Sequence, residues 1–154
     1  MVWTMVNIKE KLKQNKLTIG TWLTMAHPSI AEIMCKTGFD WIGIDLEHTS
    51  ITHREAEDLI RVIELCGSSP LVRLTSVTHD QIKRMMDAGA HGVIAPMINS
   101  KSDVEKVISG VYYPPRGTRG MGLARAQGYG ARLQEYQTWA KESPVIVVQI
   151  VHLS

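Results

Sequence analysis

The sequence predicts a single α/β domain, spanning residues 1–154, in which helices surround a parallel β-sheet. Segments with strand and helix patterns alternate along most of the chain, and this alternation is typical of parallel sheets. The strand segments are short continuous apolar runs, as expected of strands covered on both faces. Apolar residues make up 44% and charged residues 21% of the chain, which excludes disordered, collagen-like and coiled-coil proteins.

Five apolar runs are predicted to be strands. The first is interrupted by Gly20, and the second ends in a carboxylate, Asp45. A sixth, shorter strand is predicted near Met121–Ala124. The five main segments are Leu17–Leu23, Trp41–Asp45, Pro70–Leu74, Gly92–Pro96 and Pro144–Ile150.

Four segments between these strands are predicted to be amphipathic helices, because apolar residues recur three and four positions apart. The first spans Pro28–Thr37, with Pro28 in its first turn and Gly38 as its stop. Capping-box patterns, Thr52–Glu55 and Thr78–Gln81, open the second and third. The third ends at Gly89. The apolar faces of the last three helices are Ala56, Leu59, Ile60 and Ile63; Ile82, Met85 and Met86; and Val104, Val107, Ile108 and Val111.

Residues 112–132 are rich in Gly and Arg and are predicted to form a long loop, which in compact domains is usually functional or disordered. The run Gly117–Gly122 does not follow a strand or open a helix, and it lacks the Lys-Ser/Thr of a P-loop. The net charge is +2, too small to indicate a nucleic-acid surface. We therefore expect neither nucleotide nor nucleic-acid binding.

The cysteine content and the lengths of the apolar runs favour a cytoplasmic protein. The two cysteines, Cys35 and Cys66, do not make a disulfide framework and show no zinc-ligand spacing. No signal peptide is recognisable, and no apolar run is long enough to cross a membrane. We expect no membrane partner.

Two parallel-sheet architectures agree with this pattern. A doubly wound open sheet fits 154 residues directly. A (β/α)8 barrel needs about 250 residues and fits only if the chain is incomplete. Periodicity does not choose between them.

Polar residues gather where the strands end, which in both architectures is the functional edge of the sheet. Asp45 and His48 follow the second strand, Arg73 lies in the third, and Gln149 lies in the last. The spacing of Asp45 and His48 would let the carboxylate orient the imidazole as a general base. Arg73 is suited to a carboxylate or an enolate. Each residue taken alone also has a structural interpretation. Asp45 fits a helix cap, His48 fits an ordinary loop histidine, and Arg73 fits an ion pair with a neighbouring carboxylate.

Several motifs in register resemble the HpcH/HpaI aldolase/citrate lyase family. They are GTWLTMAHPSIAEIM, GFDWIGIDLEH, PLVRL, MMDAGAHGVIAPMI, YYPPRGTRGMG and VVQI, and they cover about residues 20–150. The resemblance implies a TIM barrel of the phosphoenolpyruvate/pyruvate type, assembled as a homo-oligomer, commonly a hexamer. It implies a class II pyruvate aldolase, a carbon–carbon lyase that cleaves 4-hydroxy-2-oxo acids to pyruvate and an aldehyde with Mg²⁺, Mn²⁺ or Co²⁺ as Lewis acid.

Carried over by motif, the resemblance implies that His48 is the base, acting with Asp45, and that Arg73 holds the substrate oxygens. It places Gln149 and Trp22 in the substrate pocket and implies that Asp87 reaches a neighbouring subunit's site. The chain departs from the family at the last strand, where Val151 stands in place of a glutamate metal ligand.

This departure and the length of 154 residues predict an incomplete barrel with about six of its eight strands. We expect a chain truncated at its C-terminus, with its metal ligands missing and its aldolase activity impaired. Two alternatives stay open: a non-catalytic α/β binding or assembly module, and a citramalyl- or malyl-thioester lyase of the same superfamily.

Overall fold

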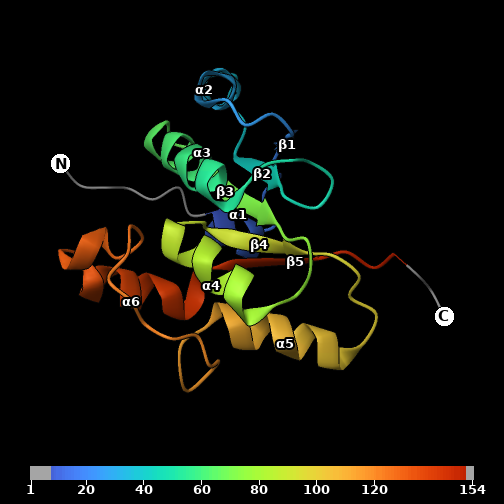
Figure 1. The fold of residues 1–154 in the computed structure, drawn as a ribbon, viewed down its shortest axis with the longest axis vertical. Helices are drawn as coiled ribbons and strands as arrows, with labels where there is room; N and C mark the ends of the chain where they lie inside the picture. The colour runs from blue at the N-terminus through green and yellow to red at the C-terminus, as the bar shows by residue number, and fades with distance from the viewer. Residues whose placement is uncertain (1–7, 152–154) are drawn as a thin grey trace.

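The computed structural model describes residues 8–151, which form a five-stranded parallel sheet with helices packed around it (Figure 1). The strands follow one another across the sheet in the order β1-β2-β3-β4-β5. All four neighbouring pairs are parallel. The strands are β1 (Gly20–Leu23), β2 (Trp41–Asp45), β3 (Ser69–Arg73), β4 (Gly92–Ala95) and β5 (Val145–Val148).

Six α-helices and one 3-10 helix are found in the described residues. Each of α2 to α5 connects one strand to the next or begins that connection, and α6 completes the last crossover. The helices are α1 (Ile8–Lys13), α2 (Pro28–Lys36), α3 (His53–Leu65), α4 (His79–Ala88), α5 (Lys101–Val111), η1 (Gly128–Gly130) and α6 (Leu133–Glu142).

The strand order distinguishes between the two architectures. In a doubly wound sheet the chain reverses direction, so that its first strand lies inside the sheet. Here β1 is an edge strand, and each later strand is added on the same side. This sequential parallel order is that of consecutive (β/α) units in a TIM barrel.

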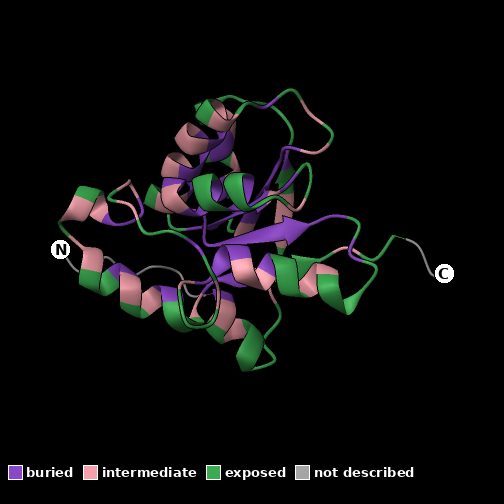
Figure 2. Cartoon of the chain, turned by 60° about the horizontal axis from the view of Figure 1, so that its bottom comes forward, coloured by how far each residue is buried: buried purple, intermediate pink, exposed green. Residues whose placement is uncertain are grey.

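The two faces of the sheet pack differently, as expected for part of a barrel wall. Ile42, Ile44, Val72 and Val93 join the main core with residues from α2 to α5. A smaller cluster on the other face contains Leu71, Ile94 and Val145, together with Ile8 of α1. Burial is concentrated in the strands and on the sheet-facing sides of these helices (Figure 2).

The predicted helix signals are confirmed at most positions. Pro28 opens α2, and the Thr52–Glu55 capping box at the start of α3 forms in both directions. Gly38 and Gly89 have φ angles of 91° and 106°, a left-handed conformation that favours glycine after a helix. None of the helices in the described part is long and apolar enough to cross a bilayer.

The second predicted capping box forms in one direction. The Thr78 side chain accepts a hydrogen bond from the Gln81 N–H, as expected. The Gln81 side chain turns instead to the loop after β3, where its Oε1 accepts 3.1 Å hydrogen bonds from the N–H and the hydroxyl of Thr75. Gln81 is 6% exposed, so it fixes the loop that follows Arg73.

The sixth strand near Met121–Ala124 was wrongly predicted, and residues 8–151 contain five strands rather than about six. The 112–132 segment packs against the outside of α4 instead: the Ala126 N–H donates to the Asp87 carbonyl at 2.9 Å. Helix α6 was missed because its apolar residues are few. Tyr136, Trp139 and Ala140 nevertheless form one packed face with Ala126.

Candidate active site

Asp45 and Arg73 form an ion pair at the C-terminal ends of β2 and β3. The two residues are direct partners in the sheet register, so both side chains project from the face opposite the main core. Arg73 Nε donates to Asp45 Oδ1 at 2.9 Å, and Arg73 Nη2 donates to Asp45 Oδ2. Arg73 therefore binds Asp45 through the Nε–Nη2 edge of its guanidinium, and the hydrogen bonds within the described chain leave Nη1 unused.

The surroundings of Asp45 keep it ionised. Burial opposes the charge, but hydrogen bonds from Arg73 and from the main-chain N–H groups of His48 and Glu47 outweigh it. The pKa of Asp45 therefore lies below its usual value. The main-chain donors lie 3.2 Å and 2.9 Å from Oδ1. Asp45 thus organises the loop after β2 as well as the guanidinium.

Two tryptophans shape the surface beside this ion pair. The Trp22 ring lies 4.7 Å from the Arg73 guanidinium carbon and packs edge-on against Trp41. The Trp22 ring lies over Gly43, where an added Cβ would come within 3.0 Å of the ring. The glycine thus permits Trp22 to flank Arg73, and the ring restricts the directions from which a ligand can approach the guanidinium.

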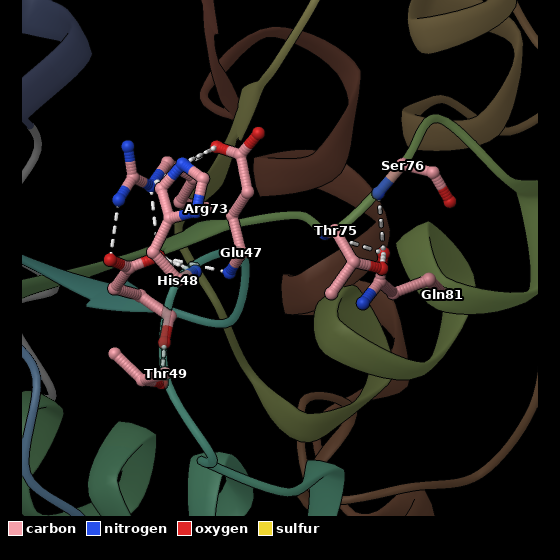
Figure 3. A network of polar contacts seen from close by, with 8 residues as sticks. Glu47, His48, Thr49, Arg73, Thr75, Ser76 and Gln81 are labelled. Atoms are coloured by element: carbon pink, nitrogen blue, oxygen red, sulfur yellow. Dashed lines mark hydrogen bonds and ion pairs between the residues drawn. The ribbon is translucent and has the colours of Figure 1, made fainter.

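The Glu47 carboxylate lies near both the His48 ring and the Arg73 guanidinium (Figure 3). Glu47 Oε2 is 3.7 Å from His48 Nε2 and 3.5 Å from Arg73 Nε. The imidazole is 70% exposed. Sequence spacing suggested that the Asp45 carboxylate orients this ring. In the structure Asp45 binds the main-chain N–H of His48, because Arg73 occupies the rest of the carboxylate, and Glu47 is the carboxylate near the ring.

Gln149 and Trp22 line the same cavity on the inner face of the sheet. The cavity has a volume of about 270 Å³, and its other walls include Trp41, Leu71 and Ile94. Gln149 is fixed by main-chain hydrogen bonds to Ala95 and Ile98 on the neighbouring segment. Trp22 therefore connects the Asp45–Arg73 pair to the cavity that Gln149 lines, and Glu47 connects His48 to the pair.

Asp87 lies elsewhere, on α4, under the 112–132 segment. Gln127 donates to it at 3.4 Å. Burial raises the pKa of Asp87 above its usual value, although the nearby Arg119 charge acts in the opposite direction. The structure does not bring Asp87 to the Asp45–Arg73 pair within this chain.

The described residues do not fit a divalent metal ion. They contain no group of three or more His, Cys, Asp or Glu side chains placed to hold one. Val151, which stands where the resemblance implies a glutamate, carries no donor atom, and hard divalent ions require oxygen ligands. Both oxygens of Asp45 are already bound by Arg73.

Two features of the site were not predicted from the sequence. Glu47 received no role, and Trp41 was interpreted as a strand residue alone. The two-residue period of a strand places Trp41, Gly43 and Asp45 on one face, so Trp41 was recognisable as a site neighbour. The contact of Glu47 with His48 depends on the loop conformation, which periodicity does not reveal.

Comparison with known proteins identifies the chain. Residues 18–151 match the sequence profile of HpcH/HpaI aldolase/citrate lyase. The chain belongs to the HpcH/HpaI aldolase/citrate lyase family. It is 35% identical over 144 residues to a 2-keto-3-deoxy-L-rhamnonate aldolase of Salmonella gallinarum, an alignment that covers 92% of this chain and 54% of the relative. It is 34% identical over 140 residues to a 2-dehydro-3,6-dideoxy-6-sulfogluconate aldolase of Pseudomonas putida, with coverages of 90% and 54%.

Solved structures of the family have the same fold. The crystal structure of an HpcH/HpaI aldolase from Desulfitobacterium hafniense superimposes with a TM-score of 0.85 at 30% identity, covering 95% of this chain and 57% of that one. The chain spans about half the length of the curated relatives it matches. The family and the fold predicted from the sequence motifs are thus confirmed.

Proposed function

We propose that this chain carries the 2-oxo-acid-binding part of a class II pyruvate aldolase site, at the C-terminal ends of β2 and β3. The observation that supports the proposal is the Asp45–Arg73 pair. Asp45 holds one edge of the guanidinium, and Nη1 and the second N–H of Nη2 stay available. A guanidinium edge presents two parallel donors, which match a carboxylate or an enolate in bidentate fashion.

In this proposal His48 is the base. For cleavage, His48 Nε2 accepts the proton of the substrate's 4-hydroxyl, and the bond between C3 and C4 breaks. The aldehyde leaves, and the electron pair becomes the pyruvate enolate, whose negative oxygen lies against Arg73. The proton held by the His48 imidazolium returns to C3, directly or through water, and gives pyruvate. Glu47, 3.7 Å from His48 Nε2, would stabilise the imidazolium.

The other predicted residues take supporting roles in the proposal. Trp22 limits the pocket beside Arg73, and Gln149 lines the inner cavity that Trp22 shares. We further propose that Asp87, which lies apart from this site in its own chain, acts at a second copy's site in a homo-oligomer. A cytoplasmic location agrees with these small-molecule partners.

The family's metal dependence leads to an expectation for the 154-residue chain. The described residues offer no metal-binding cluster, and Val151 supplies no ligand. We therefore expect the chain to bind 2-oxo acids without efficient cleavage of 4-hydroxy-2-oxo acids, even when Mg²⁺, Mn²⁺ or Co²⁺ is added.

Calorimetric titration with pyruvate and with oxalate, an enolate analogue, tests the binding proposal. Arg73→Lys should weaken binding about tenfold or more, because an ammonium loses the bidentate geometry. Arg61→Lys, on α3 outside the site, is the matched control and should leave binding unchanged. Equal affinities of the wild type and Arg73→Lys would contradict the proposal.

An activity assay tests the expectation about turnover. Aldol cleavage is followed with and without divalent ions over a panel of 4-hydroxy-2-oxo acids, and malyl- and citramalyl-thioesters are included to test the sister reaction. Rapid metal-dependent cleavage by the 154-residue chain would overturn the expected impairment. Binding without turnover would agree with both parts of the proposal.

A further inference from the structure

Two cysteines outside the candidate site lie together at the ends of neighbouring helices. Cys35 is in the last turn of α2, and Cys66 is the C-cap of α3. The two helices pack against each other (Figure 1). In the sheet-and-helix repeat they run in the same direction, so that both C-termini lie at the edge of the domain opposite Asp45 and Arg73. The proposed aldolase site uses neither residue.

Both cysteines lie near Ile63 of α3. Cys35 Sγ donates to the Ile63 carbonyl oxygen at 3.9 Å. Cys66 follows Ile63 by three positions, which is one helical turn and the same helix face. The two cysteine side chains also interact electrostatically. A disulfide between them requires their Cα atoms to lie within about 7 Å of each other, so the bond forms where the two helix ends reach that distance.

The two thiols differ in exposure in a way that sets an order of reaction. Cys66 is exposed, whereas Cys35 is 7% exposed. Burial raises the pKa of Cys35, so Cys35 stays a protonated thiol that an external oxidant does not reach. The Lys36 ammonium, which pairs with Glu32 at 2.6 Å, also interacts electrostatically with Cys66.

We propose that Cys35 and Cys66 are a peroxide-sensitive dithiol that closes to an intramolecular disulfide between the C-terminal ends of α2 and α3. The Cys66 thiolate attacks one oxygen of hydrogen peroxide, the O–O bond breaks, and the departing hydroxide is protonated to water. Cys35 then attacks the sulfur of the Cys66 sulfenic acid, and the S–O bond breaks. The leaving hydroxide takes the Cys35 proton. Two thiols lose two electrons, and one peroxide becomes two waters.

The disulfide would join two helices that enclose β2, the strand that ends in Asp45. It closes a loop of about 30 residues, which restricts the unfolded chain. We expect the melting temperature of the oxidised chain to exceed that of the reduced chain by roughly 5–15 °C. Dithiothreitol should reverse this increase.

Mass spectrometry of the native 154-residue chain after treatment with hydrogen peroxide tests the proposal. The intact mass should fall by two hydrogen atoms, and a non-reducing peptide map should link the peptides that contain Cys35 and Cys66. In Cys35→Ser, the exposed thiol should instead stop at the sulfenic acid, trapped by dimedone. In Cys66→Ser, the buried thiol should stay unmodified. Circular dichroism verifies that both variants are folded.

Three results would overturn the proposal. The first is oxygen addition at Cys66 with Cys35 still free. The second is a Cys66–Cys66 link between two chains in place of the intramolecular bond. The third is an unchanged mass of the folded wild-type chain after prolonged treatment. The readout is independent of aldolase activity, so it separates this proposal from the function proposed above.

Discussion

The Asp45 carboxylate and the Arg73 guanidinium face each other in direct register on adjacent strands, and two guanidinium nitrogens donate to the two carboxylate oxygens. The Asp45 side chain is 5% exposed and that of Arg73 is 16% exposed. Solvent screens a pair at this depth far less than a pair on a helix surface. The arrangement fixes the position of Arg73 before any ligand arrives.

Asp45→Asn should measure how much this pair contributes to the free energy of unfolding. The substitution removes the main counter-charge of the buried guanidinium, and the loss of a buried partner typically costs about 3–5 kcal/mol. Glu47, 3.5 Å from Arg73 Nε, remains as a second carboxylate. The remaining amide oxygen keeps part of the hydrogen bonding, so we expect a loss of about 2–4 kcal/mol in the free energy of unfolding. Urea denaturation at pH 7 measures it. The control is Asp58→Asn, which breaks a surface pair with Arg61 and should cost less than about 1 kcal/mol.

Acidification should destabilise the fold through Asp45 and Glu64. Burial opposes the charge of Glu64, but His91 and Arg125 outweigh it, so the pKa of Glu64 is lowered as that of Asp45 is. A carboxyl with a lower pKa in the folded state stabilises above its unfolded value, about 4, and this stabilisation is lost as the pH falls below it. The urea concentration at the midpoint of unfolding should be constant above about pH 5 and should fall steeply towards pH 3. The same fall in a variant carrying Asp45→Asn and Glu64→Gln would contradict this assignment.

The elements that the sequence predicted best are those whose periodicity and caps agree. The apolar face of α3 and its Thr52 capping box were both recognisable, and both are present. The position of Asp45 and Arg73 at one edge of the sheet was predictable, because both residues lie at the C-terminal ends of predicted parallel strands. The partner of the His48 ring was not predictable, because it depends on which carboxylate binds Arg73. The path of residues 112–132 was not predictable either, because it depends on packing across α4. Helix α6 was missed because Tyr136 and Trp139 alone give a weak period.

Asp87→Asn should stabilise the chain at neutral pH. Burial raises the pKa of Asp87, so its ionised form is disfavoured in the folded state, and stability falls as the pH rises from the unfolded value, about 4, through the folded pKa. The amide can keep the hydrogen bond to Gln127 without the charge. We expect a gain of up to about 1 kcal/mol at pH 7 that vanishes near pH 3, where the carboxyl is protonated in both states. A stabilising substitution at a buried carboxylate is typical of functional residues.

Comparison of urea unfolding at the two pH values checks this prediction. Asp80→Asn is the matched control on the same helix, because Asp80 is exposed and pairs with Arg84 at 3.0 Å. That substitution should leave stability unchanged or slightly lower. A loss of stability for Asp87→Asn at pH 7 would show that its charge is favourable in the folded chain, contrary to the argument from burial.

Glu64→Gln should release the 112–132 segment from the domain. The Glu64 carboxylate pairs with Arg125, whose Nη1 also donates to the Ala88 carbonyl at 3.0 Å. Loss of the charge weakens this attachment, and about 1.4 kcal/mol of easier local opening corresponds to a tenfold larger open population. Limited trypsin digestion should therefore cut after Arg125 about tenfold faster. Glu57→Gln, at a half-exposed pair with Arg61, should leave the cleavage rate unchanged.

Gly92→Ala should disrupt the pairing of β4 with β5. A Cβ at Gly92 would lie 2.1 Å from the Val145 carbonyl oxygen and 2.8 Å from its carbonyl carbon, distances that backbone atoms do not tolerate. The strand must move away, and overpacking of this kind costs about 1–3 kcal/mol. Gly120→Ala is the control, because nothing lies within 4 Å of a Cβ there. Urea unfolding should separate the two variants by at least about 1 kcal/mol. Equal stabilities would mean that β5 can shift without cost, and amide hydrogen exchange of Ile146 and Val147 would then be unprotected already in the wild type.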